Sequence, residues 1–284
     1  MLTLLKSIEL STEYLQKKEI ESPRLNAELL LADVLNCKRL ELFLRFDKPL
    51  SENEKIRYRE NLKRRAAKEP LQYIIGSTSF YGLDFIVNES VLIPRPETEI
   101  LVETIINSNK KESVKKILDI GFGSGCIAIT LAKYFPDAEV VGIDISEDAF
   151  KIAVENAKKL NVENVRFQTM DIFDSNAAEI FADADIIVSN PPYVSQGEFT
   201  NLQDEITKYE PKMAVSDNGN GLKFYERICE LGKENIKNGK MLYFEVGAGQ
   251  SNSVTKILEK NDFGKITTVK DYAKIERVIS GVKK

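Results

Sequence analysis

The stretch SNPPYVS (189–195) contains residue types suited to binding a planar NH2 group. A short apolar run, DIIVS (185–189), ends at Asn190, and two prolines and a tyrosine follow. Because adjacent prolines lack backbone donors and have fixed φ angles, neither a helix nor a central strand continues through them. The side-chain oxygen of Asn190 and the carbonyl oxygen of Pro191, here called the acceptor pair, could then accept the two N–H bonds of an amide or an exocyclic amine.

A glycine-rich turn follows an earlier apolar run, in KKILDIGFGSG (115–125). Its glycines allow a tight turn and bring backbone N–H groups close to a ligand, but its spacing fits neither a dinucleotide site nor a phosphate-binding P-loop. Asp144 ends the next predicted strand, where an acid can bind both ribose hydroxyls of a nucleoside. Taken singly, the turn could be an ordinary loop, Asp144 a helix cap and Asp119 a structural acid. Together, in order, these features predict an adenosine ligand without phosphates, and S-adenosylmethionine fits.

The predicted cofactor-binding residues lie at the ends of four successive strands. They are Asp119, Gly121, Phe122, Gly123, Ser124, Gly125, Asp144, Asp171, Ile172 and Asn190. The chain has no histidine, which excludes histidine-based acid–base catalysis and histidine-ligated zinc. We predict no metal site.

The elements that must position these residues fall into two architectures. Residues 1–70 contain helical periodicity and no glycine, and residues 71–90 predict two strands that form a β-hairpin linker. From about residue 115, strands and helices alternate to the end of the chain. We therefore predict an α/β fold, with a doubly wound, mostly parallel sheet in residues 91–284 and a small N-terminal helical domain.

Composition limits the class of protein. The formal net charge is −4, so no overall excess of positive charge favours nucleic acid. The three cysteines are far apart and suit a reducing cytoplasm. We expect neither a signal peptide nor a membrane span, and we expect a cytoplasmic monomer.

With these pieces placed, the chain resembles the release factor glutamine methyltransferases (the PrmC/HemK family). The resemblance extends through most of the chain and is most specific at VLIPRPETE. The matching blocks are NAELLLADVL (26–35), EPLQYIIG (69–76), VLIPRPETE (91–99), DIGFGSGCIAI (119–129), SNPPYV (189–194), EPKMAV (210–215) and FEVGAGQ (244–250). Phe122 and Lys274 depart from the usual pattern, and we expect them to alter packing and not chemistry.

The resemblance implies a Rossmann-like methyltransferase that uses S-adenosylmethionine. Its substrate would be the glutamine of the Gly-Gly-Gln motif in class I peptide chain release factors, methylated at N5. Residues 1–70 would help to dock that protein substrate. The catalytic residues would be Asn190, Pro191 and Tyr193, with Pro192 also contacting substrate and the Tyr193 ring packing on the amide.

Two alternatives use the same acceptor pair. One is an amino-methyltransferase acting on adenine or guanine in nucleic acid, which would have to bring the base out of its stack. The other methylates a glutamine of a ribosomal protein. The acidic balance and the VLIPRPETE block count against a nucleic-acid substrate. The basic stretch 55–68 could meet an acidic patch on a release factor or ribosomal RNA, but a solvated helix face is the favoured interpretation. Arg95 and Glu97 could line the substrate entrance, or Glu97 could cap a helix, and we favour structural roles for both.

Overall fold

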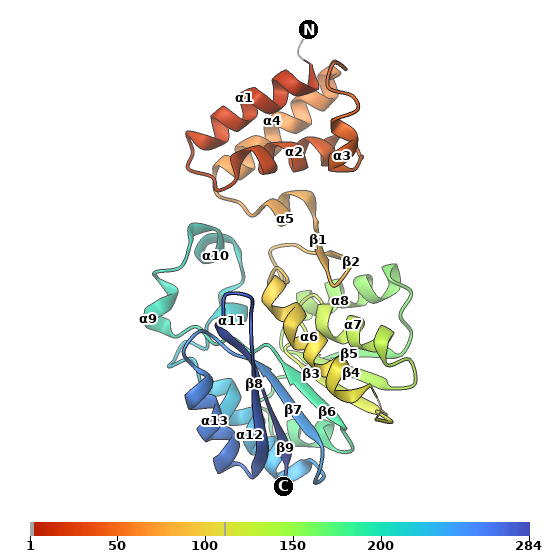
Figure 1. The fold of residues 1–284 in the computed structure, drawn as a ribbon, viewed down its shortest axis with the longest axis vertical. Coiled ribbons are helices and arrows are strands. Elements are labelled where there is room, and N and C mark those ends of the chain that lie inside the picture. Colours follow the sequence, from red (N-terminus) through yellow and green to blue (C-terminus); the bar gives the residue numbers. More distant parts are fainter. Residues whose placement is uncertain (1–2, 111) are drawn as a thin grey trace. The chain divides into compact units, whose positions relative to one another are not determined.

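The computed structural model describes residues 3–110 and 112–284. The chain divides into two compact units, coloured by sequence in Figure 1. The helical unit comprises Met1–Ser77 and Gln203–Tyr209, and the sheet unit comprises Thr78–Leu202 and Glu210–Lys284.

The helical unit is a small bundle with its own apolar core. Leu4 and Ile8 from the first helix, Leu30 from the second and Leu62 from the fourth are buried together. Ser51 begins the fourth helix and forms a capping box with Glu54, which satisfies backbone donors at that end. The helices are α1 Leu4–Gln16, α2 Pro23–Val34, α3 Arg39–Leu42, α4 Glu52–Ala66, α5 Leu71–Ile75 and α10 Asp204–Tyr209.

The first residues of the predicted hairpin are helical. The two strands occupy β1 Ser77–Phe80 and β2 Leu83–Ile86, whereas Leu71–Ile75 forms α5. Pro70 precedes this helix, and Gly76 ends it in the left-handed region at φ 80°, which is a common way for a helix to stop. The prediction of a strand from residue 71 was wrong because this apolar run buries Ile74 in the helical core.

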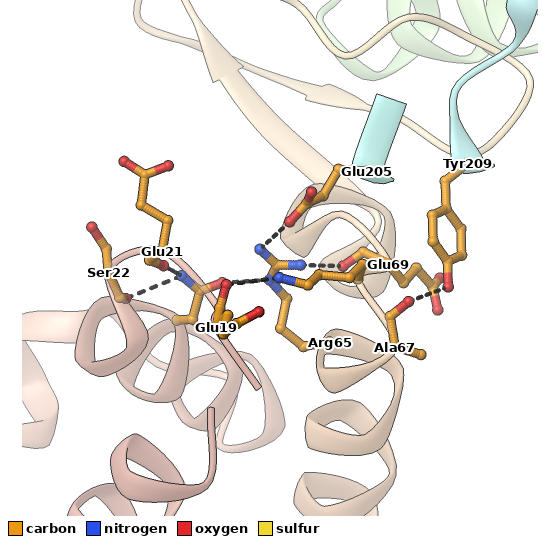
Figure 2. Close-up of polar contacts among 10 residues, drawn as sticks. Glu19, Glu21, Ser22, Arg65, Ala67, Glu69, Glu205 and Tyr209 are labelled. Carbon is orange, nitrogen blue, oxygen red and sulfur yellow. Dashed lines mark hydrogen bonds and ion pairs between the residues drawn. The ribbon is translucent and has the colours of Figure 1, made fainter. Parts of the chain in front are cut away.

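Helix α10 belongs to the helical unit although it lies more than a hundred residues further along the chain. Figure 2 shows its contacts: the Glu205 carboxylate pairs with the Arg65 guanidinium at 3.1 Å, and the Tyr209 hydroxyl donates to the Ala67 carbonyl at 2.8 Å. Arg65 is buried, and it also donates to the Asn26 side-chain oxygen at 2.7 Å. The ends of α2 and α4 are therefore joined to α10 by a shared polar cluster.

Besides the hairpin of β1 and β2, the described residues of the sheet unit form one seven-stranded sheet, in the order β5-β4-β3-β6-β7-β9-β8. Strands β3 to β7 pair in parallel, and β9 pairs antiparallel with both β7 and β8. The strands are β3 Lys116–Ile120, β4 Glu139–Asp144, β5 Val165–Thr169, β6 Ile186–Ser189, β7 Met241–Glu245, β8 Phe263–Lys270 and β9 Glu276–Lys283. The helices of this unit are α6 Pro96–Asn109, α7 Cys126–Tyr134, α8 Glu147–Lys159, η1 Ser175–Phe181, α9 Gln196–Phe199, α11 Lys212–Val215, α12 Lys223–Asn235 and α13 Ser251–Lys260.

Both faces of the sheet are covered by helices. Helices α6, α7 and α8 lie on one face, and α12 and α13 on the other (Figure 1). Because successive strand residues point to opposite faces, Ile117 belongs to the apolar core of the first face and Leu118 to that of the second. The predicted α/β fold, with its mostly parallel sheet, N-terminal helical region and hairpin, is confirmed. Within the described residues, no helix is both long enough and apolar enough to cross a bilayer.

Candidate active site

A cavity of about 370 Å³ lies at the carboxyl ends of the parallel strands. Strand β3 pairs with β4 on one side and β6 on the other, so the strand order reverses there, as at the ligand sites of other doubly wound sheets. Eight of the predicted site residues line the cavity: Gly121, Gly123, Asp144, Asp171, Ile172, Asn190, Pro191 and Pro192. Five are not among its lining: Asp119, Phe122, Ser124, Gly125 and Tyr193.

The glycine turn presents bare backbone to the cavity. Gly121 and Gly123 have φ angles of 78° and 52°, and a methyl group added at either would meet nothing within 4 Å. Phe122 points the other way and packs its ring on Phe167, with centroids 4.7 Å apart. The turn can therefore expose its peptide groups to a ligand while Phe122 contributes to packing.

Asp144 lies at the cavity wall beside this turn. Its carboxylate accepts from the Gly123 N–H at 2.9 Å and from the Ser146 N–H at 3.0 Å. Burial raises its pKa, and these backbone donors oppose that rise. A carboxylate has about four acceptor positions, so further lone pairs remain available for hydroxyl donors.

Asp119 is fully buried below the turn. One carboxylate oxygen accepts from the Ala128 N–H at 3.1 Å, and the other has no partner among the residues that the structure describes. Burial raises the pKa of Asp119 to about 7. The hydrogen bond from Ala128 ties Asp119 to the start of α7, and contact of Asp119 with the cofactor stays a prediction.

Asn190 is held by two residues that the sequence alone did not indicate. Its side-chain N–H donates to the Thr98 hydroxyl at 3.2 Å, and this hydroxyl donates to the Glu245 carboxylate at 2.6 Å. Thr98 lies in the first turn of α6, within the VLIPRPETE block, and Glu245 ends β7, within FEVGAGQ. Membership of those blocks was the only signal, and it assigned neither residue a role.

Tyr193 contacts two residues that follow strand β7 or end it. Its hydroxyl lies 3.5 Å from the Glu245 carboxylate, and its backbone carbonyl accepts from the Gln250 side chain at 2.8 Å. Stacking of the Tyr193 ring on a substrate amide stays a prediction. The observed contacts instead brace the chain after the two prolines.

Arg95 supports a neighbouring wall of the cavity. Its guanidinium pairs with the buried carboxylate of Glu210, one residue before the cavity-lining Pro211. This ion pair joins the VLIPRPETE block to the EPKMAV block, and the favoured structural role of Arg95 stays a prediction. Glu97 lies in the first turn of α6, where a negative charge is favoured by the helix dipole.

The buried Glu245 predicts a pH dependence of stability. Burial raises its pKa from 4.5 to about 7 in the folded state, so between these values the folded protein holds a proton that the unfolded chain releases. Because of Glu245, the free energy of unfolding therefore falls as pH rises through this range. Relative to Glu245→Gln, the wild type should lose up to about 3 kcal/mol of unfolding free energy between pH 5 and pH 8. Urea unfolding at both pH values measures this difference, and equal pH dependence of the two proteins would contradict it.

Two known protein families match separate parts of the chain. Residues 8–76 match the family described as PrmC N-terminal domain, and residues 111–261 match the family described as methyltransferase domain. The release factor glutamine methyltransferase of Fusobacterium nucleatum is 43% identical over 270 residues, which are 95% of this chain and 76% of that protein. That of Geobacter sulfurreducens is 39% identical over 279 residues, which are 98% of this chain and 96% of that protein.

Solved structures support the fold alone. The hMettl16 catalytic domain, in complex with a MAT2A 3′UTR hairpin, aligns with a TM-score of 0.55 at 15% identity. The alignment covers 78% of this chain and 81% of that one. Asp144, Asn190 and Pro191 all line the cavity at the switch in strand order.

Proposed function

The chain belongs to the release factor glutamine methyltransferase family, and we propose that it methylates N5 of the Gly-Gly-Gln glutamine in class I peptide chain release factors, using S-adenosylmethionine. One observation carries the proposal: Asp144, at the end of β4, and the acceptor pair, after β6, line the same cavity. A nucleoside-type methyl donor and a planar amide would then meet in one chamber. The names of the relatives supply the substrate class.

The residues of the cavity fit S-adenosylmethionine. Asp144 offers carboxylate oxygens for ribose hydroxyls, and the backbone of Gly121 and Gly123 is open toward the cavity. Ile172 and Phe173 supply apolar surface on which an adenine ring could lie. When bound, the cofactor supplies an electrophilic methyl group with a neutral thioether as leaving group.

The protein's task in this reaction is alignment. An amide nitrogen is a poor nucleophile because its lone pair is delocalised into the carbonyl. If the acceptor pair accepts both N–H bonds of the substrate amide, the nitrogen is held pointing at the methyl group. Positioning of this kind can lower the activation free energy by roughly 7–11 kcal/mol in favourable cases. As positive charge grows on the nitrogen, the Asn190 oxygen and the Pro191 carbonyl stabilise it, and the final proton can pass to water.

The test uses the full chain, labelled S-adenosylmethionine and a purified release factor. We expect label on the wild-type release factor and none on a variant whose Gly-Gly-Gln glutamine is changed to alanine. Separate reactions contain RNA and ribosomal proteins. Label on both release factors, or only on RNA or a ribosomal protein, would overturn the proposed substrate in favour of one of the alternatives.

Asp144→Ala should weaken cofactor binding before it slows the chemical step. Loss of hydrogen bonds to a charged acceptor costs about 1.5–3 kcal/mol, so we expect a rise of about 10- to 100-fold in the dissociation constant. Isothermal titration with S-adenosylmethionine measures it, with turnover taken at saturating cofactor. Asp148→Ala is the control because, among the described residues, this exposed acid forms an ion pair only with Lys151 on α8. Unchanged cofactor affinity in Asp144→Ala would remove Asp144 from the site.

Action as a monomer in the cytoplasm stays a prediction from the sequence. The three cysteines, Cys37, Cys126 and Cys229, are free thiols in the structure. Docking of the release factor by the helical unit is part of the proposal and rests on the family resemblance.

A further inference from the structure

We propose that Thr98 and Glu245 determine which end of the Asn190 amide faces the cavity, and that they are positioning residues for methyl transfer. The inference deepens the proposed function and rests on it. Neither residue is among those that line the cavity, so each would act through Asn190. The orientation of the Asn190 amide depends on how many protons the Thr98 hydroxyl can give.

A threonine hydroxyl has one proton and two lone pairs. When Glu245 is ionised it has no proton to give, so Thr98 donates its own proton to that carboxylate at 2.6 Å, and toward Asn190 the Thr98 oxygen has only lone pairs to offer. Only the NH2 end of the Asn190 side chain can complete that contact, at 3.2 Å. The opposite end, the side-chain oxygen, is thereby turned away from Thr98 and left for the substrate.

Both partners are themselves held in place. Thr98 and Glu245 are each 2% exposed. The backbone carbonyl of Glu245 accepts from the Tyr225 hydroxyl at 2.9 Å, and the second carboxylate oxygen has the Tyr193 hydroxyl at 3.5 Å. Burial raises the pKa of Glu245 to about 7, while the Thr98 hydrogen bond favours the ionised form. That bond keeps the Thr98 proton directed at the carboxylate.

A reversed Asn190 amide would disable the acceptor pair. Its NH2 group would face the N–H bonds of the substrate amide, so two donors would meet with no acceptor between them. Its oxygen would meet the Thr98 oxygen, whose proton is already given to Glu245. Both of these contacts disfavour the reversed form. Removing the Thr98 hydroxyl abolishes the contact between the Asn190 oxygen and the Thr98 oxygen.

The test compares Thr98→Val, Thr98→Ser and Thr104→Val in the full chain. Thr104 is a matched control on the same helix, because its hydroxyl donates only to the Ile100 carbonyl one turn earlier. With the wild-type release factor as substrate, Thr98→Val should lower kcat by about 10- to 100-fold, with the dissociation constant of S-adenosylmethionine within about twofold of wild type. Thr98→Ser retains a hydroxyl and should recover kcat to within about threefold.

Two further measurements separate positioning from general damage. In an Asn190→Ala background, adding Thr98→Val should cause no further loss, because the residue through which Thr98 acts is gone. Thermal unfolding identifies any variant that fails to fold, and Thr98→Ala then takes the place of Thr98→Val. The inference is overturned if Thr98→Val matches Thr104→Val, if Thr98→Ser is as impaired as Thr98→Val, or if cofactor affinity falls with turnover. Failure of the wild-type chain to label the release factor would count against the proposed function instead.

Discussion

Asn190→Ala is expected to lower methyl transfer at saturating cofactor by about 10²- to 10³-fold, the size of effect seen when one preorganised hydrogen-bonding group is removed from an active site. The substitution removes the only side-chain member of the acceptor pair. The Pro191 carbonyl remains and can accept one N–H bond, so the substrate nitrogen is free to rotate away from the methyl group. Single-turnover transfer of labelled methyl to the release factor measures the loss.

Cofactor binding separates this effect from collapse of the cavity. Asn190→Ala leaves the glycine turn and Asp144 in place, so the dissociation constant of S-adenosylmethionine should change by less than about threefold, a smaller change than loss of one hydrogen bond to a charged group would cause. Asn201→Ala, which shortens an exposed amide side chain soon after the same motif, is the matched control and should behave as wild type. Near-normal turnover by Asn190→Ala would exclude the acceptor-pair mechanism.

Gly221→Ala is the second substitution with a large expected effect, although this glycine is far from Asn190 in the sequence. The added methyl group would lie 2.3 Å from the Tyr193 carbonyl oxygen and 2.8 Å from the Gln250 side-chain nitrogen. These two atoms form the hydrogen bond that braces the chain after the prolines. One backbone oxygen and its partner must therefore move, and the acceptor pair, two and three residues before Tyr193, would move with them.

The matched control for this substitution is Gly239→Ala. Gly221 and Gly239 have φ angles of 80° and 84°, but a methyl group at Gly239 would meet nothing within 4 Å. Both variants should lose about 1 kcal/mol of stability from the left-handed backbone. Only Gly221→Ala should lose a further 1–3 kcal/mol or so from overlap, and only it should lose turnover by about tenfold or more. Equal unfolding free energies and equal kcat values in the two variants would show that the overlap relaxes without cost.

Much of the sheet unit could be predicted because its signals are local. The alternation of apolar runs with helical periodicity indicated β3 to β7, and the glycine turn and Asp144 lie where a parallel sheet places its strand ends. The same logic failed at Leu71–Ile75, where a short apolar run can be a strand or a buried turn of helix. There, the core of the helical unit decided the outcome.

The support for Asn190 could not be predicted from local pattern. Thr98 and Glu245 are 147 residues apart in the chain, and their hydrogen bond exists only once α6 packs beside β7. Each residue taken alone is an ordinary polar side chain near the end of an element. Their burial and their distance to each other turn them into candidates for a role, and only the structure provides both.

The position of α10 has a consequence for dividing this protein into fragments. The chain passes between the two units three times, at residues 77–78, 202–203 and 209–210. A cut at residue 77 would leave the N-terminal piece without Glu205 and Tyr209, and would leave Arg65 without its carboxylate partner. The remaining piece would contain α10 without the helices it packs on. Protein engineers who wish to exchange the helical unit between relatives should therefore transplant Gln203–Tyr209 together with the first 77 residues.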